Sequence, residues 1–555
     1  MNDSSGTIKS LLERLRNDFG DIVAFRIKRN DVYVEFTGSG VVRKAGSVGA
    51  QLAAAGVQPG DRVALLSDNQ PEWGIGYLGI VCHGYIAVPI DRLLKPAEYQ
   101  RILADSGTVA ILVSDTYLKD VEGIADALPA LTHRLSLETV ASTEAPSPPP
   151  DHPVQPEDLA VLIYTSGTTG HPKGVMLSHK NILSNVIGCS KAISYTKGDN
   201  FLSVLPLHHT FECTAGFLAP LYEGASVTYV GSLKSRDIIN TMQETQATIM
   251  LGVPLLYEKM YAGIIRAVKS KPAMVQTLFK LSMGLVKFGE TFGLSLGHAI
   301  FRSLREKGGF GSVRFFVSGA AALPPEVTLG FQRLGLRVLQ GYGLTEASPV
   351  VSVNPYIRPK NDSIGPTIPG VEIRILNPDE NGVGELLVRG DNVMLGYYNN
   401  PEATKAVLLD GWLYTGDSGR VDADGHYYIS GRLKNVIVTR AGKNIYPEEI
   451  EGALVLSLYI AEVVVLGAID EKSGEEIVRA IIVPDFEYLE QNSLPLDDAS
   501  VEKLIRGEVK TICDNMADYK RVKEIEIRKE EFPKTSTRKV KRFMVQSPPS
   551  STGQS

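Results

Sequence analysis

The sequence predicts an α/β fold, because short apolar runs of strand length alternate with segments of helical periodicity. Three such runs each precede a glycine-rich turn: residues 159–164, 313–317 and 338–340. After Arg432 the pattern changes to shorter units, and strand-like runs follow at residues 462–466, 479–483 and 525–528. These observations predict a large N-terminal part followed by a separate, small α+β domain.

Two stretches are too rich in proline to continue this pattern. Residues 145–158 contain prolines that exclude a regular helix or a central strand, so we expect a surface linker or a long loop. The tail after Arg542 is polar and rich in Pro and Ser, so we expect it to lack a packed structure, with residues 546–555 as a disordered tail.

The composition is that of a globular protein and gives no support for nucleic acid as a partner. The 555 residues are 43% hydrophobic and 22% charged, which is enough for several domains with cores of their own. The net charge of −6 provides no basic footprint for nucleic acid. The four cysteines are scattered, without the CxxC pairs of a zinc site or the density of a disulfide framework, so a reducing cytoplasm fits best.

The sequence offers no obvious membrane anchor. Residues 1–21 alternate charges with single apolar residues, unlike a signal peptide. We find no uncharged apolar run of about 18 residues, the length that a membrane-spanning helix needs. Any contact would therefore be peripheral, at the inner face of a membrane for a cytoplasmic protein.

A dense cluster of glycines and hydroxyls follows the first apolar run. The segment Ile163–Gly174 holds four Ser/Thr hydroxyls, three glycines and one lysine. Glycines let backbone amides approach an anion, hydroxyls donate hydrogen bonds to it, and a lysine adds a mobile positive charge. We therefore favour a phosphate-binding loop over an ordinary turn, with these residues as ligands: Thr165, Ser166, Gly167, Thr168, Thr169, Gly170 and Lys173. Pro172 stands where a Walker A motif needs glycine, which argues against a P-loop NTPase.

A helix is expected directly after this loop. Ser178 is placed to cap its N-terminus. Four apolar residues then share one helical face: Ile182, Leu183, Val186 and Ile187.

Two further motifs agree with the loop. Gln340–Glu346 reads QGYGLTE, and Asp410–Asp417 reads DGWLYTGD and continues to Gly431–Lys434. With these motifs, most of Ala45–Arg542 resembles the adenylate-forming, or AMP-binding, superfamily, and within it the long-chain fatty acyl-CoA synthetase group. The resemblance implies an α/β fold with a large multi-subdomain N-terminal adenylate-forming domain and a small mobile α+β C-terminal domain. It places these domains at residues 1–432 and 433–545, with Lys434 as the hinge between them.

The resemblance assigns roles around ATP to these motifs. It implies that Tyr342 offers a stacking face for adenine, that Glu346 binds Mg²⁺, and that Asp417 accepts the two ribose hydroxyls. Arg432 adds a cation near the ribose and the phosphates. The remaining ATP- or AMP-binding positions are Ala320, Gln340, Gly341, Gly343 and Thr345. Small-residue packing is the alternative for the run that contains Ala320, and surface salt bridging is the alternative for Asp417 and Arg432.

The resemblance also implies a catalytic lysine near the C-terminus. By order in the last motif, Lys539 takes the place of the family's lysine that bridges the substrate carboxylate and the phosphate oxygens. Arg538 stands before it where the family usually has glycine. This departure leaves Lys534 and Lys541 as rivals for the role.

Further implied residues concern the acyl group and CoA. His209, in the run Pro206–Glu212, would lie beside the substrate carboxylate and gate the access of CoA, while a core histidine is the alternative and His208 the less favoured neighbour. Gly442 would line the passage for the pantetheine arm of CoA, and Lys443 is a weaker CoA candidate. A plain glycine turn is the alternative for Gly442.

The implied activity is ATP-dependent fatty acid–CoA ligation, with ATP, Mg²⁺ and coenzyme A as the small molecules. A fatty acyl-AMP ligase that loads an acyl carrier protein is the nearest alternative enzyme, although the sequence shows no obvious insertion after Arg432 that would block CoA. A non-catalytic nucleotide-binding scaffold is an alternative of another class, favoured only by Arg538. No motif points to a luciferase-type oxygenase.

Residues 261–301 form an amphipathic, partly basic segment whose length and content resemble long-chain members of the family. Four apolar residues fall near helical spacing, with two lysines on another side: Leu278, Leu281, Leu285 and Phe288, then Lys280 and Lys287. We expect the leucines to pack in a core. A lipid-facing role is the alternative, because basic amphipathic helices bind anionic interfaces.

Overall fold

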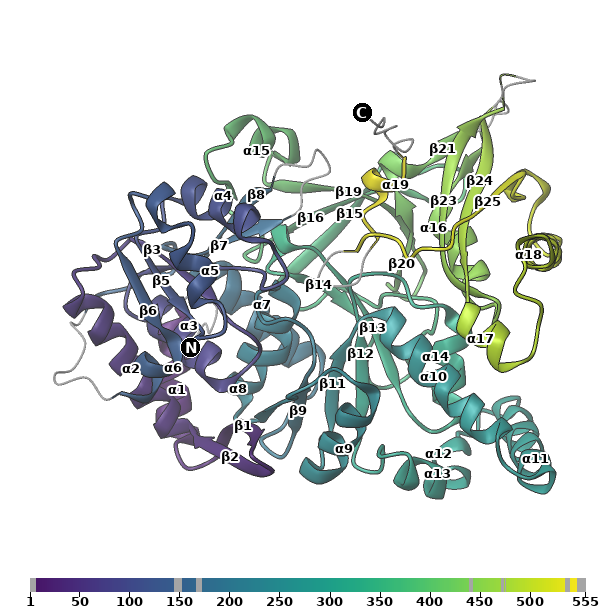
Figure 1. The fold of residues 1–555 in the computed structure, drawn as a ribbon, viewed down its shortest axis with the longest axis horizontal. Coiled ribbons are helices and arrows are strands. Elements are labelled where there is room, and N and C mark those ends of the chain that lie inside the picture. The colour runs from purple at the N-terminus through teal and green to yellow at the C-terminus, as the bar shows by residue number, and fades with distance from the viewer. Residues whose placement is uncertain are drawn as a thin grey trace. The chain divides into compact units, whose positions relative to one another are not determined.

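Residues 6–143, 152–165, 172–438, 443–470, 474, 476–534 and 540–546 are described by the computed structural model, in which the chain forms two units (Figure 1). The larger unit contains Met1–Ala321, Glu326–Ile373 and Val388–Leu413. The smaller unit contains Ala322–Pro325, Arg374–Leu387 and Tyr414–Ser555. The domain boundary expected after Arg432 stays a prediction.

The larger unit contains two sheets whose central strands are parallel. The eight-stranded sheet has an antiparallel pair at each end, and the seven-stranded sheet has antiparallel pairs only at the end formed by β17, β8 and β7. The eight-stranded sheet has the order β14 (Val350–Val353), β13 (Val338–Gly343), β12 (Phe315–Ser318), β11 (Ile249–Gly252), β9 (Asn200–Ser203), β10 (Ser226–Tyr229), β1 (Val23–Arg29), β2 (Val32–Thr37). The seven-stranded sheet has the order β17 (Gly396–Tyr397), β8 (Lys173–Ser178), β7 (Leu159–Thr165), β4 (Ile86–Pro89), β3 (Arg62–Leu66), β5 (Ala110–Val113), β6 (His133–Ser136). Helices link the parallel strands, so the predicted α/β fold class is confirmed.

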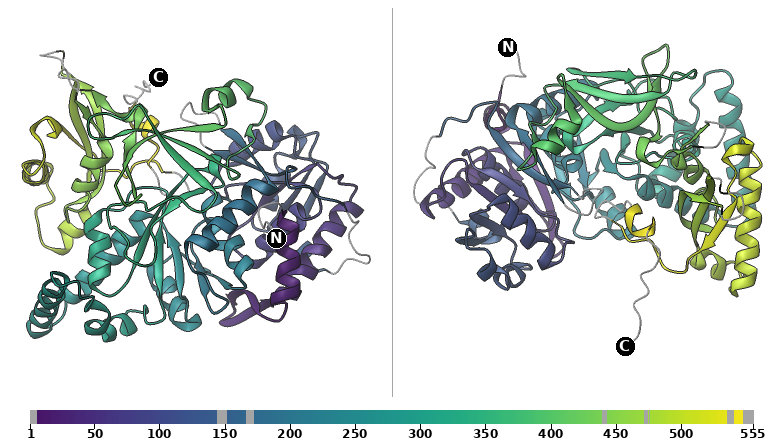
Figure 2. Two further views of the ribbon diagram at one scale, coloured as in Figure 1. Left: turned by 180° about the vertical axis from the view of Figure 1, so that it is seen from behind. Right: turned by 90° about the horizontal axis from the view of Figure 1, so that it is seen from above.

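Helices lie against both sheets (Figure 2). Helix α3 contacts β1 of one sheet and β3 and β4 of the other. The helices of this part of the chain are α1 (Ile8–Phe19), α2 (Gly38–Ala54), α3 (Pro71–Val81), α4 (Pro96–Ser106), α5 (Leu118–Glu122), α6 (Leu137–Ser142), α7 (His179–Ala192), α8 (Ala219–Glu223), α9 (Ser235–Thr245), α10 (Pro254–Lys269), α11 (Ala273–Glu290), α12 (Gly297–Ile300), α13 (Arg302–Lys307), α14 (Pro325–Arg333) and α15 (Pro401–Val407).

An aromatic cluster packs helix α3 against the eight-stranded sheet. The rings of Phe25 on β1 and Trp73 on α3 both pack against Phe217, with centroids 5.7 and 6.2 Å away. Tyr77 stacks on Trp73 at 5.3 Å, and Tyr229 meets Phe25 edge-on at 5.8 Å. All five side chains are buried. Such contacts add specific geometry to a large area of apolar burial, so this cluster fixes α3, which also contacts β3 and β4 of the other sheet, against the eight-stranded sheet.

Helix α7 begins where the sequence predicts. The side chain of Ser178 accepts the N–H of Asn181 at 3.1 Å, and the side chain of Asn181 accepts the N–H of Ser178 at 2.8 Å. This capping box satisfies two donors that a helix start would leave without partners. The four apolar residues predicted for one face, at positions 182, 183, 186 and 187, are all buried.

The remaining strands form three smaller sheets. One has the order β15 (Val371–Leu376), β16 (Gly384–Gly390), β19 (Trp412–Val421), β18 (Leu408–Leu409), with β20 (Tyr427–Arg432) on β19. The others are β21 (Ile437–Val438) with β22 (Asn444–Ile445), and β23 (Ile460–Ile469), β24 (Glu476–Pro484), β25 (Glu524–Ile527). Strands β23 and β24 contain the first two runs predicted for the small α+β domain, and β25 contains the third run except for its last residue, Arg528. The helices of this part are α16 (Pro447–Leu454), α17 (Phe486–Gln491) and α18 (Asp498–Cys513).

Three expectations about segments outside the sheets can be compared with the structure. The described part of the proline-rich linker, residues 152–158, contains no helix or strand, as predicted. The prediction that the tail after Arg542 lacks structure is wrong for its first residues, because Arg542–Gln546 forms the short helix α19. No helix among the described residues is long and apolar enough to cross a membrane.

The prediction that the leucines of residues 261–301 pack in a core is wrong for α11. Leu278, Leu281, Leu285 and Phe288 are all more than half exposed. The helix instead turns a different set of residues inward, among them Val286, which belongs to a buried cluster with Phe301 and Leu334.

Candidate functional site

The carboxyl ends of neighbouring parallel strands bring several predicted site segments to one edge of the eight-stranded sheet. Gly252 on β11 pairs with Ser318 on β12, and Ser318 pairs with Gln340 on β13. In parallel α/β sheets this edge is where ligands bind. The loops that follow β11 and β12 begin at Val253 and Gly319, and β13 leaves its pairing with β12 after Gln340, so Ala320 and Gln340–Glu346 share one edge.

Ala320 has an unusual backbone in this loop. Its φ is +74°, in the left-handed region that residues with a side chain rarely adopt. The preceding Gly319 has no space for a side chain, because an added Cβ would lie 2.8 Å from the ring of Phe211. Backbone strain of this kind is concentrated at functional sites. The binding role of Ala320 stays a prediction.

The QGYGLTE segment forms a tight hairpin with β14. Gly341 and Tyr342 pair with Val353 and Ser352. Gly343 must be glycine, because a Cβ there would lie 2.1 Å from the carbonyl oxygen of Pro349. Thr345 opens the short helix η4 (Thr345–Ala347), which carries Glu346. Gln340 is buried and donates from Nε2 to the carbonyl of Asn361 at 2.6 Å, so its side chain braces the hairpin from inside.

Tyr397 connects the hairpin predicted to bind phosphate with the predicted Mg²⁺ ligand. Thr165 and Lys173 stand opposite each other on β7 and β8, at the mouth of the loop. The ammonium of Lys173 lies 5.0 Å from the ring centroid of Tyr397, and the hydroxyl of Tyr397 donates to Oε1 of Glu346 at 2.8 Å. Strand β17 holds Tyr397 in place by pairing with β8. The structure therefore brings Thr165, Lys173 and Glu346 together; Ser166, Gly167, Thr168, Thr169 and Gly170 lie outside the described residues.

A second network fixes the turn that carries Glu346. The buried amide of Asn185 on α7 donates to the carbonyls of Val350 and Ala347 at 2.7 and 3.3 Å, and it accepts the N–H of Val350 at 3.1 Å. Asn392 also donates to the carbonyl of Ala347, at 2.8 Å. The sequence analysis missed Tyr397 and Asn185, because partners 51 and 165 positions apart leave no local pattern.

His209 lies in a cluster that includes an acid from another loop. The rings of His208 and His209 are 4.3 Å apart, and Nε2 of His208 approaches Oδ1 of Asp91 to 3.5 Å. Ligand atoms of all three residues lie within 4.8 Å of one another. His208 is buried, whereas His209 is partly exposed. The role of His209 beside the substrate carboxylate stays a prediction. Asp91 was not predicted.

Glu212 is a buried acid in the same segment. It lies on η3 (Phe211–Leu218), a π-helix, and burial raises its pKa to about 8 against the opposing effect of a hydrogen bond with Ser203. Among the described residues, Oε2 of Glu212 has no hydrogen-bond partner. A carboxyl group in such surroundings keeps its proton at neutral pH.

The smaller unit holds the predicted ribose ligands as a pair. Asp417 on β19 stands opposite Arg432 on β20, and Nε of Arg432 lies 2.8 Å from Oδ1 of Asp417. Asp417 is buried, while nearly half of the Arg432 side chain is exposed. The N–H of Asp417 donates to Oγ1 of Thr415 at 3.0 Å, which fixes the start of the acid's side chain. The ion pair leaves the ribose role of Asp417 a prediction.

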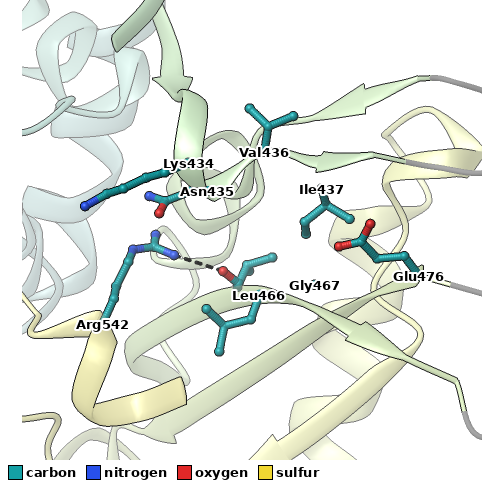
Figure 3. A pocket seen from close by; sticks show the side chains of 9 residues that line it. Lys434, Asn435, Val436, Ile437, Leu466, Gly467, Glu476 and Arg542 are labelled. Carbon is teal, nitrogen blue, oxygen red and sulfur yellow. Dashed lines mark hydrogen bonds between the residues drawn. The ribbon is translucent and has the colours of Figure 1, made fainter. Parts of the chain in front are cut away.

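A pocket in the smaller unit surrounds the predicted hinge. Its lining consists of Lys434, Asn435, Val436, Ile437, Val465, Leu466, Gly467, Glu476 and Arg542 (Figure 3). Burial lowers the pKa of Lys434, with the positive charge of Arg432 acting in the same direction and Asp417 opposing it. Arg542 donates to the carbonyl of Val465 at 2.9 Å. Lys434 sits in η5 (Leu433–Asn435), directly after β20. Its hinge role stays a prediction.

The three candidate lysines of the last motif differ in what the structure says of them. Lys539 lies outside the described residues. Lys534 is nearly buried, and its ammonium pairs with Glu462 and with Glu531, the latter at 2.9 Å. The backbone N–H of Lys541 donates to the carbonyl of Pro533 at 2.8 Å. A lysine held between two carboxylates is a poor candidate to approach a phosphate.

Of the two residues predicted to bind CoA, one lies among the described residues and one does not. Lys443 is exposed and lies 3.9 Å from a carboxylate oxygen of Glu380, a separation at which an exposed pair contributes little stability. Gly442 lies outside the described residues. The CoA roles of both residues stay predictions.

Comparison with known proteins identifies the family. The AMP-binding enzyme family model matches residues 12–398, and the model of the AMP-binding enzyme C-terminal domain matches residues 449–539. The chain belongs to the AMP-binding enzymes. Membership confirms both the predicted superfamily and the adenylate-forming fold with a large and a smaller domain.

This AMP-binding enzyme resembles ligases for different acids. It is 30% identical over 553 residues to a long-chain-fatty-acid–CoA ligase of Bacillus subtilis (strain 168), which covers 90% of this chain and 88% of the relative. It is also 30% identical over 449 residues to a feruloyl-CoA synthase of an Amycolatopsis species, which covers 80% of this chain and 82% of the relative. The crystal structure of the anthranilate CoA ligase AuaEII with anthranoyl-AMP matches with a TM-score of 0.80 at 26% identity, covering 98% and 97% of the two chains.

These relatives support AMP-forming ligation of acyl or aryl acids to CoA as the general activity of this AMP-binding enzyme, with ATP and CoA as substrates. They do not select the acid, because fatty and aromatic acids are both represented among them.

Replacing Asn185 with Leu should destabilise the turn that carries Glu346. The change leaves the buried N–H and carbonyl of Val350 without their partner, and we expect the free energy of unfolding to fall by about 3 kcal/mol, measured by chemical denaturation. Asn240→Leu, at an exposed position of α9, is the matched control and should change stability by less than about 0.5 kcal/mol. Equal stability of the two variants would contradict the bracing role of Asn185.

Glu212 should make the enzyme less stable as the pH rises. The ordinary pKa of the carboxyl is 4.5 and the folded value is about 8, so the folded state holds a proton that the unfolded chain has lost. Its contribution is complete below the unfolded pKa and is lost as the pH rises toward the folded pKa. Relative to Glu212→Gln, the wild-type free energy of unfolding should decline by up to about 1.4 kcal/mol per pH unit in that window.

Denaturation of both proteins at about pH 6 and about pH 8 measures this difference. Glu157→Gln replaces an exposed glutamate and should leave the wild-type pH dependence unchanged. Parallel pH profiles for wild type and Glu212→Gln would show that the buried carboxyl does not ionise in this range.

Proposed function

We propose that this AMP-binding enzyme is an ATP-dependent fatty acid–CoA ligase. The acid and ATP would form an acyl-adenylate and pyrophosphate, after which CoA takes the acyl group and AMP is released. The observation that carries the proposal is the contact chain Lys173–Tyr397–Glu346, since it joins a cation at the mouth of a phosphate-binding loop to an oriented carboxylate.

The site has the donor chemistry that Mg²⁺ requires. Tyr397 holds one carboxylate oxygen of Glu346 and thereby orients the other, and Mg²⁺ prefers hard oxygen ligands of this kind beside phosphate oxygens. When bound there, Mg²⁺ would neutralise phosphate charge during pyrophosphate release. Lys173 would supply a second cation to the same phosphates.

In the first step, a carboxylate oxygen of the fatty acid attacks the α-phosphorus and the bond to the pyrophosphate oxygen breaks. Two anions must meet, so orientation and positive charge provide most of the catalysis. We assign the bridging charge to Lys539, because its rival Lys534 is already paired with Glu462 and Glu531. His209 would lie beside the acid and donate a hydrogen bond to it.

In the second step, the CoA sulfur attacks the acyl carbonyl carbon and the bond to the AMP phosphate oxygen breaks. We assign Asp417 and Arg432 to the ribose and phosphates of the nucleotide, and Gly442 and Lys443 to CoA. Lys434 is assigned to the hinge, about which the smaller domain would rotate so that both steps can take place at one bound nucleotide. The remaining nucleotide contacts are proposed for Ala320, Gln340, Gly341, Tyr342, Gly343 and Thr345, with Thr165–Gly170 around the phosphates.

The fatty acid is proposed from the Bacillus subtilis relative, which the chain matches over nearly its whole length. A panel of fatty and aromatic acids, each with Mg·ATP and with or without CoA, tests the choice by following pyrophosphate, AMP and thioester. We expect CoA-dependent thioester with fatty acids. Turnover confined to aromatic acids would overturn the assignment of a fatty acid as substrate. Pyrophosphate exchange without thioester formation would favour a carrier protein as the acyl acceptor. No ATP-dependent reaction with any acid would favour the non-catalytic scaffold.

Lys539→Ala should separate the two half-reactions. Loss of the bridging charge should slow adenylation by about 100-fold or more, while thioester formation from preformed acyl-adenylate stays near the wild-type rate. Single-turnover assays of each half-reaction measure this. Lys541→Ala, two positions away in the same motif, is the matched control. Equal loss in both halves, or a larger effect of Lys541→Ala, would refute the assignment to Lys539.

A further inference from the structure

Helix α11 presents an apolar stripe to the solvent. The stripe consists of Met274, Leu278, Leu281, Leu285, Phe288 and, just past the helix end, Phe292. Their exposed fractions are 81, 64, 67, 53, 63 and 68%. The spacing alternates between four and three residues, so all six side chains fall on one face of the helix. We call this surface the outer face of α11.

The outer face is not needed to fold the helix, because α11 has a separate inner face. Phe279, Met283 and Val286 belong to the apolar cluster that contains Phe301 and Leu334. With 3.6 residues per turn, these positions lie on the side of the helix opposite to Leu281 and Leu285. When a helix is apolar on two opposite faces, one face packs in the core, and an exposed apolar face of this kind is typical of an interaction site.

The charge around the outer face has one sign. Between residues 261 and 289 there is no Asp or Glu, although the whole chain has a net charge of −6. Five cations occupy this stretch, and all of them are exposed: Arg266, Lys269, Lys271, Lys280 and Lys287. The next acid, Glu290, pairs with Arg333 at 2.9 Å on the inner side. The charges that residues 261–289 themselves contribute are therefore all positive.

These charges indicate which kind of partner the outer face of α11 binds. A symmetric contact with a second copy would bring together two segments that each hold five cations and no acid, so like charges would approach without opposite charges to pair them, which is unfavourable. The stripe also covers fewer than the three to four heptads typical of a coiled coil. An anionic bilayer surface, in contrast, accepts apolar side chains and attracts the flanking cations.

We propose that the outer face of α11 binds the surface of an anionic lipid bilayer, with the helix lying in the plane of the interface. Met274, Leu278, Leu281, Leu285, Phe288 and Phe292 enter the region between head groups and acyl chains, while Lys280 and Lys287 contact the anionic head groups. Helix α11 lies at the edge of the larger unit in Figures 1 and 2, where a flat surface can reach it. This inference does not depend on the proposed substrate.

Vesicle co-sedimentation of the full chain tests the proposal without an activity readout. We expect binding to phosphatidylcholine vesicles that contain phosphatidylserine to be at least about tenfold stronger than to phosphatidylcholine alone, and to weaken as salt is added. The variant Leu278→Gln, Leu281→Gln, Leu285→Gln should lose this binding by about tenfold or more. So should Lys280→Glu with Lys287→Glu, which keeps the apolar stripe but reverses two charges.

The matched control replaces exposed apolar residues elsewhere. Val32→Ser with Ile357→Ser removes side chains that are 66 and 74% exposed, and it should bind vesicles like the wild type. Because all these side chains are exposed, each variant should keep the wild-type melting temperature and its turnover of a short, soluble acid.

Three results would overturn the proposal. In the first, the wild type binds neutral vesicles as well as anionic ones. In the second, the Val32/Ile357 control loses as much binding as the leucine variant. In the third, the leucine variant binds as strongly as the wild type. Sedimentation velocity tests whether a second copy of the chain binds the outer face instead. If the wild type forms a dimer that the leucine variant does not form, and does not bind vesicles, the outer face would be assigned to a second copy.

Discussion

The hydrogen bond from Tyr397 to Glu346 is the interaction on which the proposed phosphate site of the larger unit depends. A tyrosine can use its hydroxyl to hold a carboxylate and its ring face to hold a cation, and Tyr397 does both, with Glu346 and Lys173. Its own position follows from the pairing of β17 with β8, the strand that begins with Lys173. Two charged groups from distant parts of the chain are thus oriented by one neutral ring.

The features that local sequence patterns could predict are those in which neighbours along the chain interact. The strand before the phosphate loop, the Ser178 cap of α7 and the three C-terminal strands were found because alternation and capping act within a few residues. Tyr397 and Asn185 were not found, because their partners are far away along the chain and only the folded sheet brings them together. Periodicity located the stripe on α11 but could not tell an exposed apolar face from a buried one, and so the core assignment was wrong.

Several unfavourable features gather in the loops after the parallel strands of the eight-stranded sheet. Ala320 has a positive φ after β12, and the segment after β9 continues into the π-helix η3 with the buried acid Glu212. Each of these lowers the stability of the fold, and each breaks a local rule that most of the chain obeys. Departures of this kind are expected where a binding site is built. The surrounding network of Asn185 and Asn392 offsets part of this loss by satisfying the buried backbone groups of the adjacent turn.

The exposed stripe of α11 also bears on the choice of substrate. Long-chain fatty acids partition into bilayers because each buried methylene favours the apolar phase by about 0.8 kcal/mol, whereas small aromatic acids have far less to gain. An enzyme for aromatic acids would have no use for an apolar, cation-flanked face that risks aggregation. Helix α10 begins two residues after β11, at the same sheet edge as Ala320 and Gln340, and leads directly to α11. Strand β9, which leads to His209, the residue assigned to the acid, is the parallel neighbour of β11 and ends at the same edge. A bilayer on the outer face of α11 would therefore meet the chain one helix away from this edge, an arrangement that serves a substrate taken from the membrane.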